Sequence, residues 1–213
     1  EKLIAELNVQ PGGAEHAARL SSRLEGLKRT ASRRRELEIA LKAGSIDTGS
    51  ADELLHIYRE RKEEPLLLKT VEDMLRAKTG ITPDTSLAVA RLCNVAGWQT
   101  QQKVALREFA ARAKAGDQDA RHLEAAKMLC ALGEQAKAAE LLEKYVAGSP
   151  QSGAAWLELA AIRCSTGDSK GGIEALQQAI ERGGNEACAI ARRDTRFKSV
   201  YDTRVFRNLV GIK

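Results

Sequence analysis

Three histidines are the residues of this sequence best suited to hold a metal ion or to move a proton. They are His16, His56 and His122, and each stands alone on a segment whose residues favour helix. None of them has a cysteine or carboxylate at the spacing that metal ligands require. We therefore expect His122 to serve in packing, and we expect no metal site.

Four cysteines could bind metal or carry out redox chemistry, but Cys93, Cys130, Cys164 and Cys188 form no Cys-x-x-Cys motif. Cys130 and Cys164 occupy equivalent places in a repeat described below. Neighbouring helices lie about 8–10 Å apart, too far for an unstrained disulfide. We interpret all four as reduced apolar residues, which favours a cytoplasmic location. A signal or anchor removed upstream of Glu1 would instead place the chain in the periplasm or at a membrane.

A glycine-rich segment, Gly167-Asp168-Ser169-Lys170-Gly171-Gly172, has the composition of a phosphate-binding loop. It lacks the P-loop spacing and follows no strand, so we interpret it as a turn between helices. The carboxylates Glu63-Glu64 lie at a charged helix end, where solvation accounts for them. Because no nucleophile is accompanied by a base, we expect a protein that is not an enzyme and that uses no cofactor.

The composition favours helices as the elements that position these residues. Of 213 residues, 43% are hydrophobic, 30% charged and only 4% aromatic, with 4 Pro and abundant Ala, Leu, Glu, Lys and Arg. This balance favours helix over sheet and argues against disorder. No apolar run approaches the roughly 20 residues of a membrane helix. We predict an all-α protein of one or two domains.

A long amphipathic basic helix is expected over residues 14–44, after a lead-in over residues 1–13. Its apolar residues follow at spacings of three and four, and Gly13 and Gly44 bound it. They are Ala17, Leu20, Leu24, Leu27, Ala31, Leu37 and Leu41. This stripe is a candidate surface for a homo-oligomer through residues 14–43, although a coiled coil is only weakly indicated.

Positive charge is concentrated at both ends of the chain. Residues 19–35 carry a net charge of +6 and residues 192–213 a net +5, so an acidic middle of −6 gives the total of +5. The candidate basic patch consists of Arg29, Arg33, Arg34 and Arg35. Such a patch attracts nucleic acid or anionic membranes. The alternative, that arginine stems cover apolar surface on solvated helices, is favoured because no base-stacking aromatic residues accompany the patch.

Capping signals predict two helix hairpins over residues 50–116. Ser50 and Glu53 form a capping box. Thr82-Pro83 is a cap followed by proline at the first helical position, and Thr100 can cap a further helix.

A 34-residue period follows over residues 117–184. The first unit carries His122, Ala125, Ala126, Leu129, Gly133, Ala138, Leu142, Tyr145 and Pro150. The same offsets in the second unit carry Trp156, Leu159, Ala160, Arg163, Gly167, Gly172, Leu176, Ala179 and Gly184. Small residues let paired helices approach closely, so each unit is predicted to be a helix hairpin that turns at its first glycine.

These units resemble the tetratricopeptide repeat (TPR) family, whose unit has the same length. Trp156, Leu159 and Ala179 match the family's motif in the second unit, and Ala138 and Pro150 match it in the first. The departures are Ala126 and Ala160 in place of Gly, Arg163 in place of Tyr and Gly172 in place of Ala. The resemblance implies a right-handed α-solenoid of stacked antiparallel helix pairs. The hairpins of residues 50–116 match the motif poorly, so they are either degenerate TPR-like units or helix hairpins outside the repeat.

Residues 185–213 are expected to form a helical cap. Asp194-Thr195-Arg196-Phe197 resembles the Asp-Pro-Arg-Phe endings that follow the last repeat in many bacterial TPR proteins. An open end of a helical array needs cover for its last apolar face. Residues suited to cover it are Phe197, Tyr201, Phe206 and Leu209.

The resemblance also implies a binding surface, because the first helix of each TPR unit lines a concave face. The positions that contact ligands in the family are here Ala120, Leu123, Lys127, Cys130, Ala131, Ala154, Leu157, Ala161, Cys164 and Ser165. These residues lack the Lys and Asn with which some family members clamp chaperone carboxylates. Their small apolar character favours a protein or peptide partner such as an amphipathic helix. The alternative is that the chain's own helices fill this face.

We therefore expect a non-enzymatic scaffold or adaptor that binds a protein through its concave helical face. One alternative is an accessory protein that docks on nucleic acid or an anionic membrane through its basic ends. The other is a self-assembling structural subunit.

Overall fold

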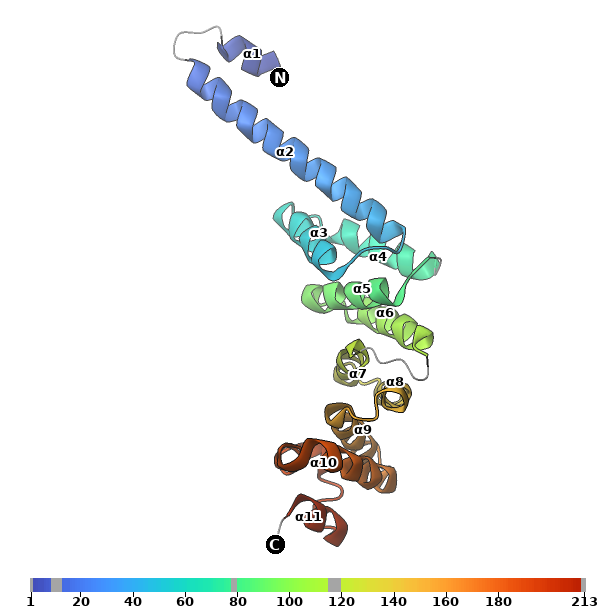
Figure 1. Ribbon diagram of the computed structural model, residues 1–213. Coiled ribbons are helices and arrows are strands. Elements are labelled where there is room, and N and C mark those ends of the chain that lie inside the picture. The colour runs from blue at the N-terminus through green and yellow to red at the C-terminus, as the bar shows by residue number, and fades with distance from the viewer. Residues whose placement is uncertain (1, 9–12, 78–79, 115–119, 212–213) are drawn as a thin grey trace. The chain divides into compact units, whose positions relative to one another are not determined.

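The computed structural model describes residues 2–8, 13–77, 80–114 and 120–211 (Figure 1). Within these ranges the regular structure is entirely helical and contains no strand, which confirms the all-α prediction. The chain divides into two compact units, Glu1–Ala96 and Gly97–Lys213. No helix in the described ranges is both long enough and apolar enough to cross a membrane.

The first unit contains, among its described residues, α1 (Lys2–Asn8), α2 (Gly13–Lys42), α3 (Thr48–Glu60), α4 (Glu64–Ala77) and α5 (Pro83–Ala96). The long helix α2 packs against α1, α3 and α4, and α3 also packs against α5. Fully buried side chains form the core, among them Leu41, Leu54, Leu67, Val71 and Leu92. The apolar stripe thus correctly predicts α2, since its last residues, Leu37 and Leu41, enter this core.

The start of α3 differs from the sequence prediction. Asp47, not Ser50, is the N-cap: its carboxylate accepts hydrogen bonds from the Ser50 amide at 2.9 Å and the Ser50 hydroxyl at 2.7 Å. Glu53, the expected second half of the capping box, pairs with Arg33 at 2.8 Å. Aspartate and serine cap helices about equally well, so an aspartate three residues earlier took the role.

Of the two other predicted helix caps, the structure confirms one and contradicts the other. The prediction for Thr82-Pro83 is confirmed, because the Thr82 hydroxyl accepts a hydrogen bond from the Thr85 amide at 3.1 Å. The prediction for Thr100 is wrong: α6 begins at Gln99, after Trp98, which provides no side-chain cap.

The second unit contains α6 (Gln99–Arg112), α7 (Arg121–Ala131), α8 (Gln135–Gly148), α9 (Gly153–Ser165), α10 (Ser169–Ala191), the 3-10 helix η1 (Thr195–Phe197) and α11 (Arg204–Val210). Each of α7 to α9 packs against the next helix in the chain, and α6 packs against α7 and α8. Gly133 and Gly167, at the turns after α7 and α9, have φ of 81° and 95°. That backbone region favours glycine, which explains why the period has glycine there. The boundary between the two units separates α5 from α6, and so divides the second hairpin predicted in residues 50–116.

The close packing of α9 and α10 depends on Gly172. A Cβ atom at this position would lie 2.3 Å from the Cys164 sulfur and 3.0 Å from the Cys164 amide nitrogen. A larger residue would therefore require the Cys164 side chain to turn or the two helices to move apart. Farther along, α10 is kinked at Gly184, where φ is 54° and ψ is −136°, and the chain then leads into the C-terminal segment.

Aromatic residues of the C-terminal segment pack as their sequence pattern predicts. Phe197 and Phe206 are fully buried, with ring centroids 5.8 Å apart. Tyr201 packs on Phe206 at 5.3 Å, and its hydroxyl donates a hydrogen bond to the Asp194 carbonyl at 2.6 Å. η1 packs against α9, and α11 against α10, so this segment covers the end of the second unit.

Candidate functional site

The ten residues predicted to contact a partner fall into an accessible and a buried group. The exposed or half-buried residues are Ala120, Leu123, Lys127, Cys130, Ala131, Ala154 and Ser165. The buried residues are Leu157, Ala161 and Cys164, with exposed fractions of 9%, 0% and 1%. Ala161 and Cys164 cannot reach a partner in this structure, which corrects their assignment to the binding surface.

The chain itself covers this part of the predicted face. η1 packs on α9, and the Ser199 hydroxyl donates a hydrogen bond to the Cys164 carbonyl at 3.0 Å. On α10, Gly172 lies directly against Cys164. The alternative expectation, that the chain's own helices fill the face, therefore holds around Ala161 and Cys164.

A groove of about 250 Å³ remains beside the C-terminal segment, and we call it the α7–α9 groove. It brings Lys127 of α7 together with Ala154 and Leu157 of α9, as the sequence predicts. Its far wall is Ala187 and Ile190, from the part of α10 beyond the kink. Ile190 is 44% exposed. Sequence reasoning missed Ile190 because it lies outside the 34-residue units.

An ion-pair cluster closes one end of the α7–α9 groove. Arg196 donates hydrogen bonds to both carboxylate oxygens of Glu158, at 2.5 and 3.2 Å, and to Asp194 at 2.7 Å. The bonds to Glu158, and then those to Asp194, raise the pKa of Arg196 despite its burial. Burial opposes a low pKa at Asp194, but the hydrogen bonds from Arg196 outweigh it and lower that pKa. The cluster thus fastens the C-terminal segment to α9.

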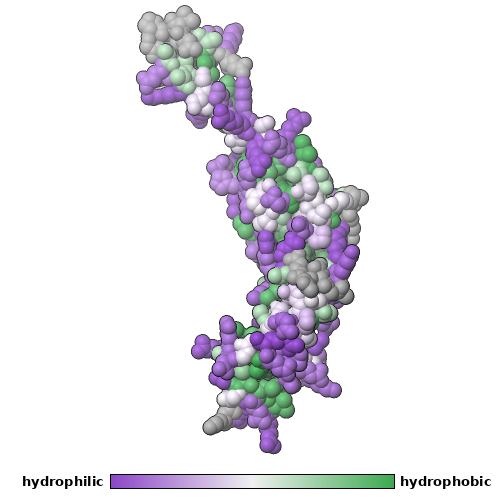
Figure 2. All heavy atoms as spheres, viewed as in Figure 1, coloured by the Kyte–Doolittle hydropathy of each residue, from purple (hydrophilic) through white to green (hydrophobic). Residues whose placement is uncertain are grey.

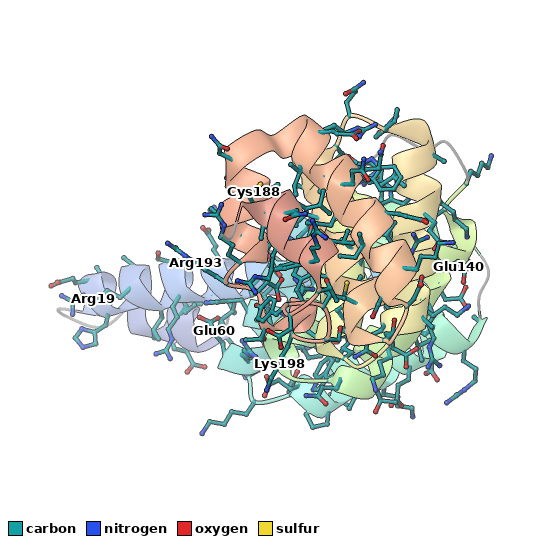
Figure 3. All side chains as sticks on the ribbon, turned by 90° about the horizontal axis from the view of Figure 1, so that it is seen from below. Arg19, Glu60, Glu140, Cys188, Arg193 and Lys198 are labelled. Carbon is teal, nitrogen blue, oxygen red and sulfur yellow. The ribbon has the colours of Figure 1, made fainter. Side chains whose placement is uncertain are left out.

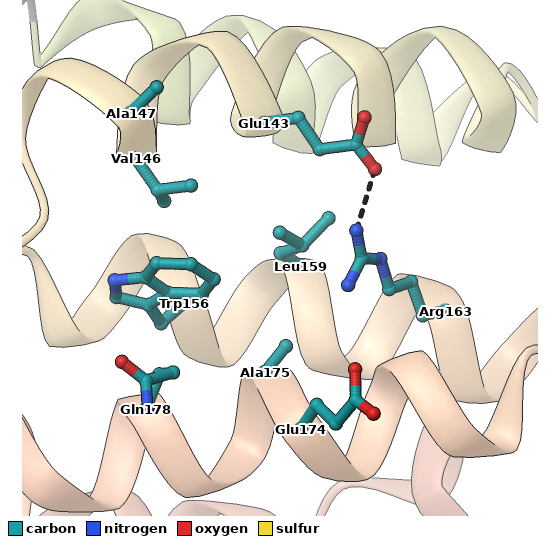
Figure 4. Close-up of a pocket in the computed structure, with 9 residues that line it drawn as sticks. All are labelled: Glu143, Val146, Ala147, Trp156, Leu159, Arg163, Glu174, Ala175 and Gln178. Carbon is teal, nitrogen blue, oxygen red and sulfur yellow. Dashed lines mark hydrogen bonds and ion pairs between the residues drawn. The ribbon is translucent and has the colours of Figure 1, made fainter.

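A second groove, of about 470 Å³, lies between α8 and α10 with α9 as its floor (Figure 4), and we call it the Trp156 groove. At about 100° per residue, Trp156, Leu159 and Arg163 lie on the side of α9 opposite Ala154 and Leu157. Its lining residues are Glu143, Val146, Ala147, Trp156, Leu159, Arg163, Glu174, Ala175 and Gln178.

The Trp156 groove has one aromatic and one charged end. The Trp156 indole lies at one end, and its Nε1 donates a hydrogen bond to the Pro150 carbonyl at 2.9 Å. At the other end Arg163 pairs with Glu143 at 2.8 Å, as Figure 4 shows. In the sequence Trp156 is a match to the repeat motif, and no feature of its spacing indicated a cavity.

Two arginines of the candidate basic patch are engaged in holding α2 to the rest of its unit. Arg34 pairs with Glu38 at 2.6 Å and Glu63 at 2.5 Å, and its guanidinium lies 4.1 Å from the Tyr58 ring centre. Burial opposes ionisation, yet these hydrogen bonds raise the pKa of Arg34. Arg33 bonds both carboxylate oxygens of Glu53.

The rest of the basic patch is exposed. Arg29 approaches Glu25 at 3.7 Å on the surface of α2. Arg35 has no carboxylate partner among the residues that the structure describes. Arg35, Arg34 and Arg61 line one shallow depression. On the C-terminal segment, Arg193 and Lys198 are exposed (Figure 3).

The cysteines and histidines show no arrangement for chemistry. All four cysteines are free thiols. Burial raises the pKa of Cys93 to about 12, and burial is also the main cause that raises the pKa of Cys130 and Cys164 to about 11. These thiols are therefore poor nucleophiles near neutral pH. In the described part of the chain, no three His, Cys, Asp or Glu residues are grouped to hold a metal ion.

His122 has the packing role that its sequence position predicts. It is 2% exposed and lies between two aromatic rings. The Phe109 ring centre is 5.3 Å away, and the Tyr145 ring stacks on it at 5.7 Å with an interplanar angle of 7°. His16 and His56 are exposed.

Comparison with known proteins adds no family assignment. No protein-family model matches the chain, and no curated protein matches it.

Proposed function

We propose that this protein is a non-enzymatic scaffold that binds an amphipathic helix of a partner protein in the α7–α9 groove. The observation that carries the proposal is the exposed apolar wall at Ile190, which faces Leu157 and Ala154 across this groove. Lys127 and Glu186 at its rim can pair with charges beside the apolar stripe of such a helix.

The proposal includes the TPR-like arrangement that the sequence suggests, a right-handed α-solenoid of stacked helix pairs. It is supported by the packing of α7, α8, α9 and α10 in chain order and by the left-handed glycines at Gly133 and Gly167. In this arrangement the first helices, α7 and α9, line the surface offered to the partner.

The test is selection of displayed helical peptides against the full chain. We expect enrichment of sequences with apolar residues at i, i+3 or i+4, and i+7. Ile190→Glu and Ala154→Glu should each weaken binding of the selected peptides about tenfold or more, because both residues line the groove and a carboxylate there would be desolvated under the bound helix. Leu157 is a poorer site for the change, since its burial would make a carboxylate there destabilise the fold.

Val95→Glu is the matched control, because Val95 is 55% exposed and belongs to the other unit. It should leave peptide binding unchanged, and circular dichroism should show equal helicity in all variants. Selected peptides that bind Ile190→Glu and Ala154→Glu as tightly as the parent chain would disprove the groove assignment.

The convergence of Arg35 and Arg61 supports a second candidate function, docking on an anionic surface. Both are exposed and lie at one depression without a carboxylate partner among the described residues. The double change Arg35→Glu and Arg61→Glu should abolish salt-sensitive binding to duplex DNA or phosphatidylserine vesicles. Arg33 and Arg34 are unsuitable for this test because they hold α2 to α3 and to Glu63. Binding that survives the double change would exclude this depression as the docking site.

A further inference from the structure

The Trp156 groove exists where the two 34-residue units differ. Thirty-four residues earlier the equivalent place is filled by three rings, that of Phe109 on α6 and those of His122 and Tyr145 in the first unit. All three are buried, with exposed fractions of 1%, 2% and 7%. Within the same chain, therefore, this position is built as a packed aromatic cluster.

The second unit keeps only one of these rings. Thirty-four residues later, Phe109 becomes Glu143, His122 becomes Trp156 and Tyr145 becomes Ala179. Of these three positions, Glu143 and Trp156 line the groove, so the space that a ring fills at Phe109 is open beside Glu143, and Leu159 of α9 and Ala175 of α10 keep the lining apolar. Among the described residues no other aromatic ring packs on Trp156, and the Arg182 guanidinium lies 5.7 Å from its ring centre.

The charged end of the groove has an excess of negative charge. Arg163 is balanced by Glu143, and it also donates a hydrogen bond to the Gly171 carbonyl at 3.3 Å. Glu174, which lines the same end, is exposed and forms no ion pair within the described part of the chain. An occupant with a cationic group would therefore complement this end.

We propose that the Trp156 groove binds a partner segment in which an aromatic side chain adjoins a lysine or arginine. The aromatic ring takes the space equivalent to the one that Phe109 fills 34 residues earlier, against Trp156 and Leu159. The neighbouring cation pairs with Glu174. Offset or edge-to-face contact between two rings stabilises the pair beyond the burial of their apolar area. This site lies on the other side of α9 from the α7–α9 groove and is a second, separate docking site.

The probe is the capped dipeptide Ac-Phe-Arg-NH2, titrated into the full ¹⁵N-labelled chain. We expect a saturable shift of the Trp156 indole N–H resonance, assigned by comparison with Trp156→Phe. The Trp98 indole belongs to α6's N-terminus and serves as the internal control. Ac-Ala-Arg-NH2, which lacks the ring, should produce no saturable shift.

Three variants separate the contributions of the ion pair, the open space and the Trp156 ring to binding of the dipeptide. Glu174→Gln should weaken binding of Ac-Phe-Arg-NH2 about two- to fivefold, as expected of a partly exposed ion pair, and should not affect Ac-Phe-Gln-NH2. Glu143→Phe restores a ring of the preceding unit and should abolish binding. If Glu143→Phe fails to fold, Trp156→Ala provides the test, followed through the Ala147 amide.

The proposal is overturned if the Trp156 indole does not shift, if Ac-Ala-Arg-NH2 shifts it equally, or if the groove-filling variant still binds. Ile190→Glu, which targets the α7–α9 groove, should leave the titration unchanged. The proposals for the two docking sites can therefore be disproved independently of each other.

Discussion

At the scale of single residues, Arg196 connects the C-terminal segment to α9. Its partner Glu158 is only 8% exposed, so an uncompensated carboxylate would remain if the arginine were removed. We expect Arg196→Met to destabilise the protein by about 1–3 kcal/mol, the usual penalty for a buried polar group left without a partner. Urea unfolding monitored by circular dichroism measures this change.

Arg193→Met is the matched control for that prediction. Arg193 is exposed and near in sequence, and it has no ion pair among the described residues. Its replacement should change the free energy of unfolding by less than about 0.5 kcal/mol. Equal effects of the two substitutions would show that Arg196 contributes no more than surface charge.

Asp194 gives this contact a dependence on acid. Its pKa in the folded protein lies below the ordinary value of about 4, because Arg196 favours the ionised form. The folded protein therefore binds this proton less readily than the unfolded chain does. The contribution of Asp194 to the free energy of unfolding is complete above about pH 4, and it is lost as the pH falls through the lowered folded-state pKa.

We accordingly expect Asp194→Asn to lower stability at pH 7 and to reduce the loss of stability between about pH 4 and pH 2. Urea midpoints measured across this range test the prediction. Parallel curves for the parent and the variant would contradict it, because they would mean that Asp194 titrates equally in the folded and unfolded states.

At the scale of helices, the same substitution should have opposite effects at two glycines. Gly26 lies inside α2, and a Cβ there would meet no atom within 4 Å. Gly26→Ala should stabilise the protein by about 0.5–1 kcal/mol through helix propensity. Gly172→Ala should destabilise it by about 1–3 kcal/mol, because the added methyl overlaps Cys164.

Thermal unfolding of both variants gives the comparison, and each serves as the control for the other. A stabilising effect at Gly172 would show that α9 and α10 can separate easily, contrary to their close packing. A destabilising effect at Gly26 would show that α2 is not helical there in solution.

How far the sequence predicts these helices depends on the range of the interactions involved. The apolar spacing of α2, the Thr82 cap and the glycine turns at Gly133 and Gly167 are local features, and the structure confirms them. The cap of α3 was misassigned because Asp47 and Ser50 compete over three residues and local preference does not distinguish them.

The candidate site was less predictable because it depends on contacts distant in sequence. Repeat offsets placed Lys127, Ala154 and Leu157 correctly at one groove. They could not show that residues after the kink would cover Cys164 and supply Ile190. Nor could they show that a cavity lies beside Glu143 and Trp156, since that depends on how the side chains of α8, α9 and α10 pack.

At the scale of the whole molecule, salt should distinguish the modes of association. Most of the visible surface is polar, with small apolar patches (Figure 2). On α2, Leu27 and Ile39 are 55% and 60% exposed, beside several arginines. Self-association through this helix would bring like charges together, so we expect it to strengthen as salt rises. Docking on nucleic acid or an anionic membrane should instead weaken as salt rises.

Sedimentation velocity between about 0.01 and 1 M salt, where the Debye length falls from roughly 30 to 3 Å, tests this expectation. The average mass should rise with salt, and Leu27→Glu should suppress the rise. An average mass that falls as salt rises, or that is unchanged by Leu27→Glu, would rule out self-association through the surface of α2 around Leu27.

The contact between Gly172 and Cys164 limits which substitutions these two positions can accept during evolution. With a cysteine at 164, a methyl group at 172 meets its sulfur, whereas the equivalent positions of the first unit hold Cys130 and a buried Ala138. The two units therefore cannot exchange single residues at this place without a change in packing. Residues 164 and 172 should vary together in descendants of this chain, with any side chain gained at one accompanied by a smaller or turned side chain at the other.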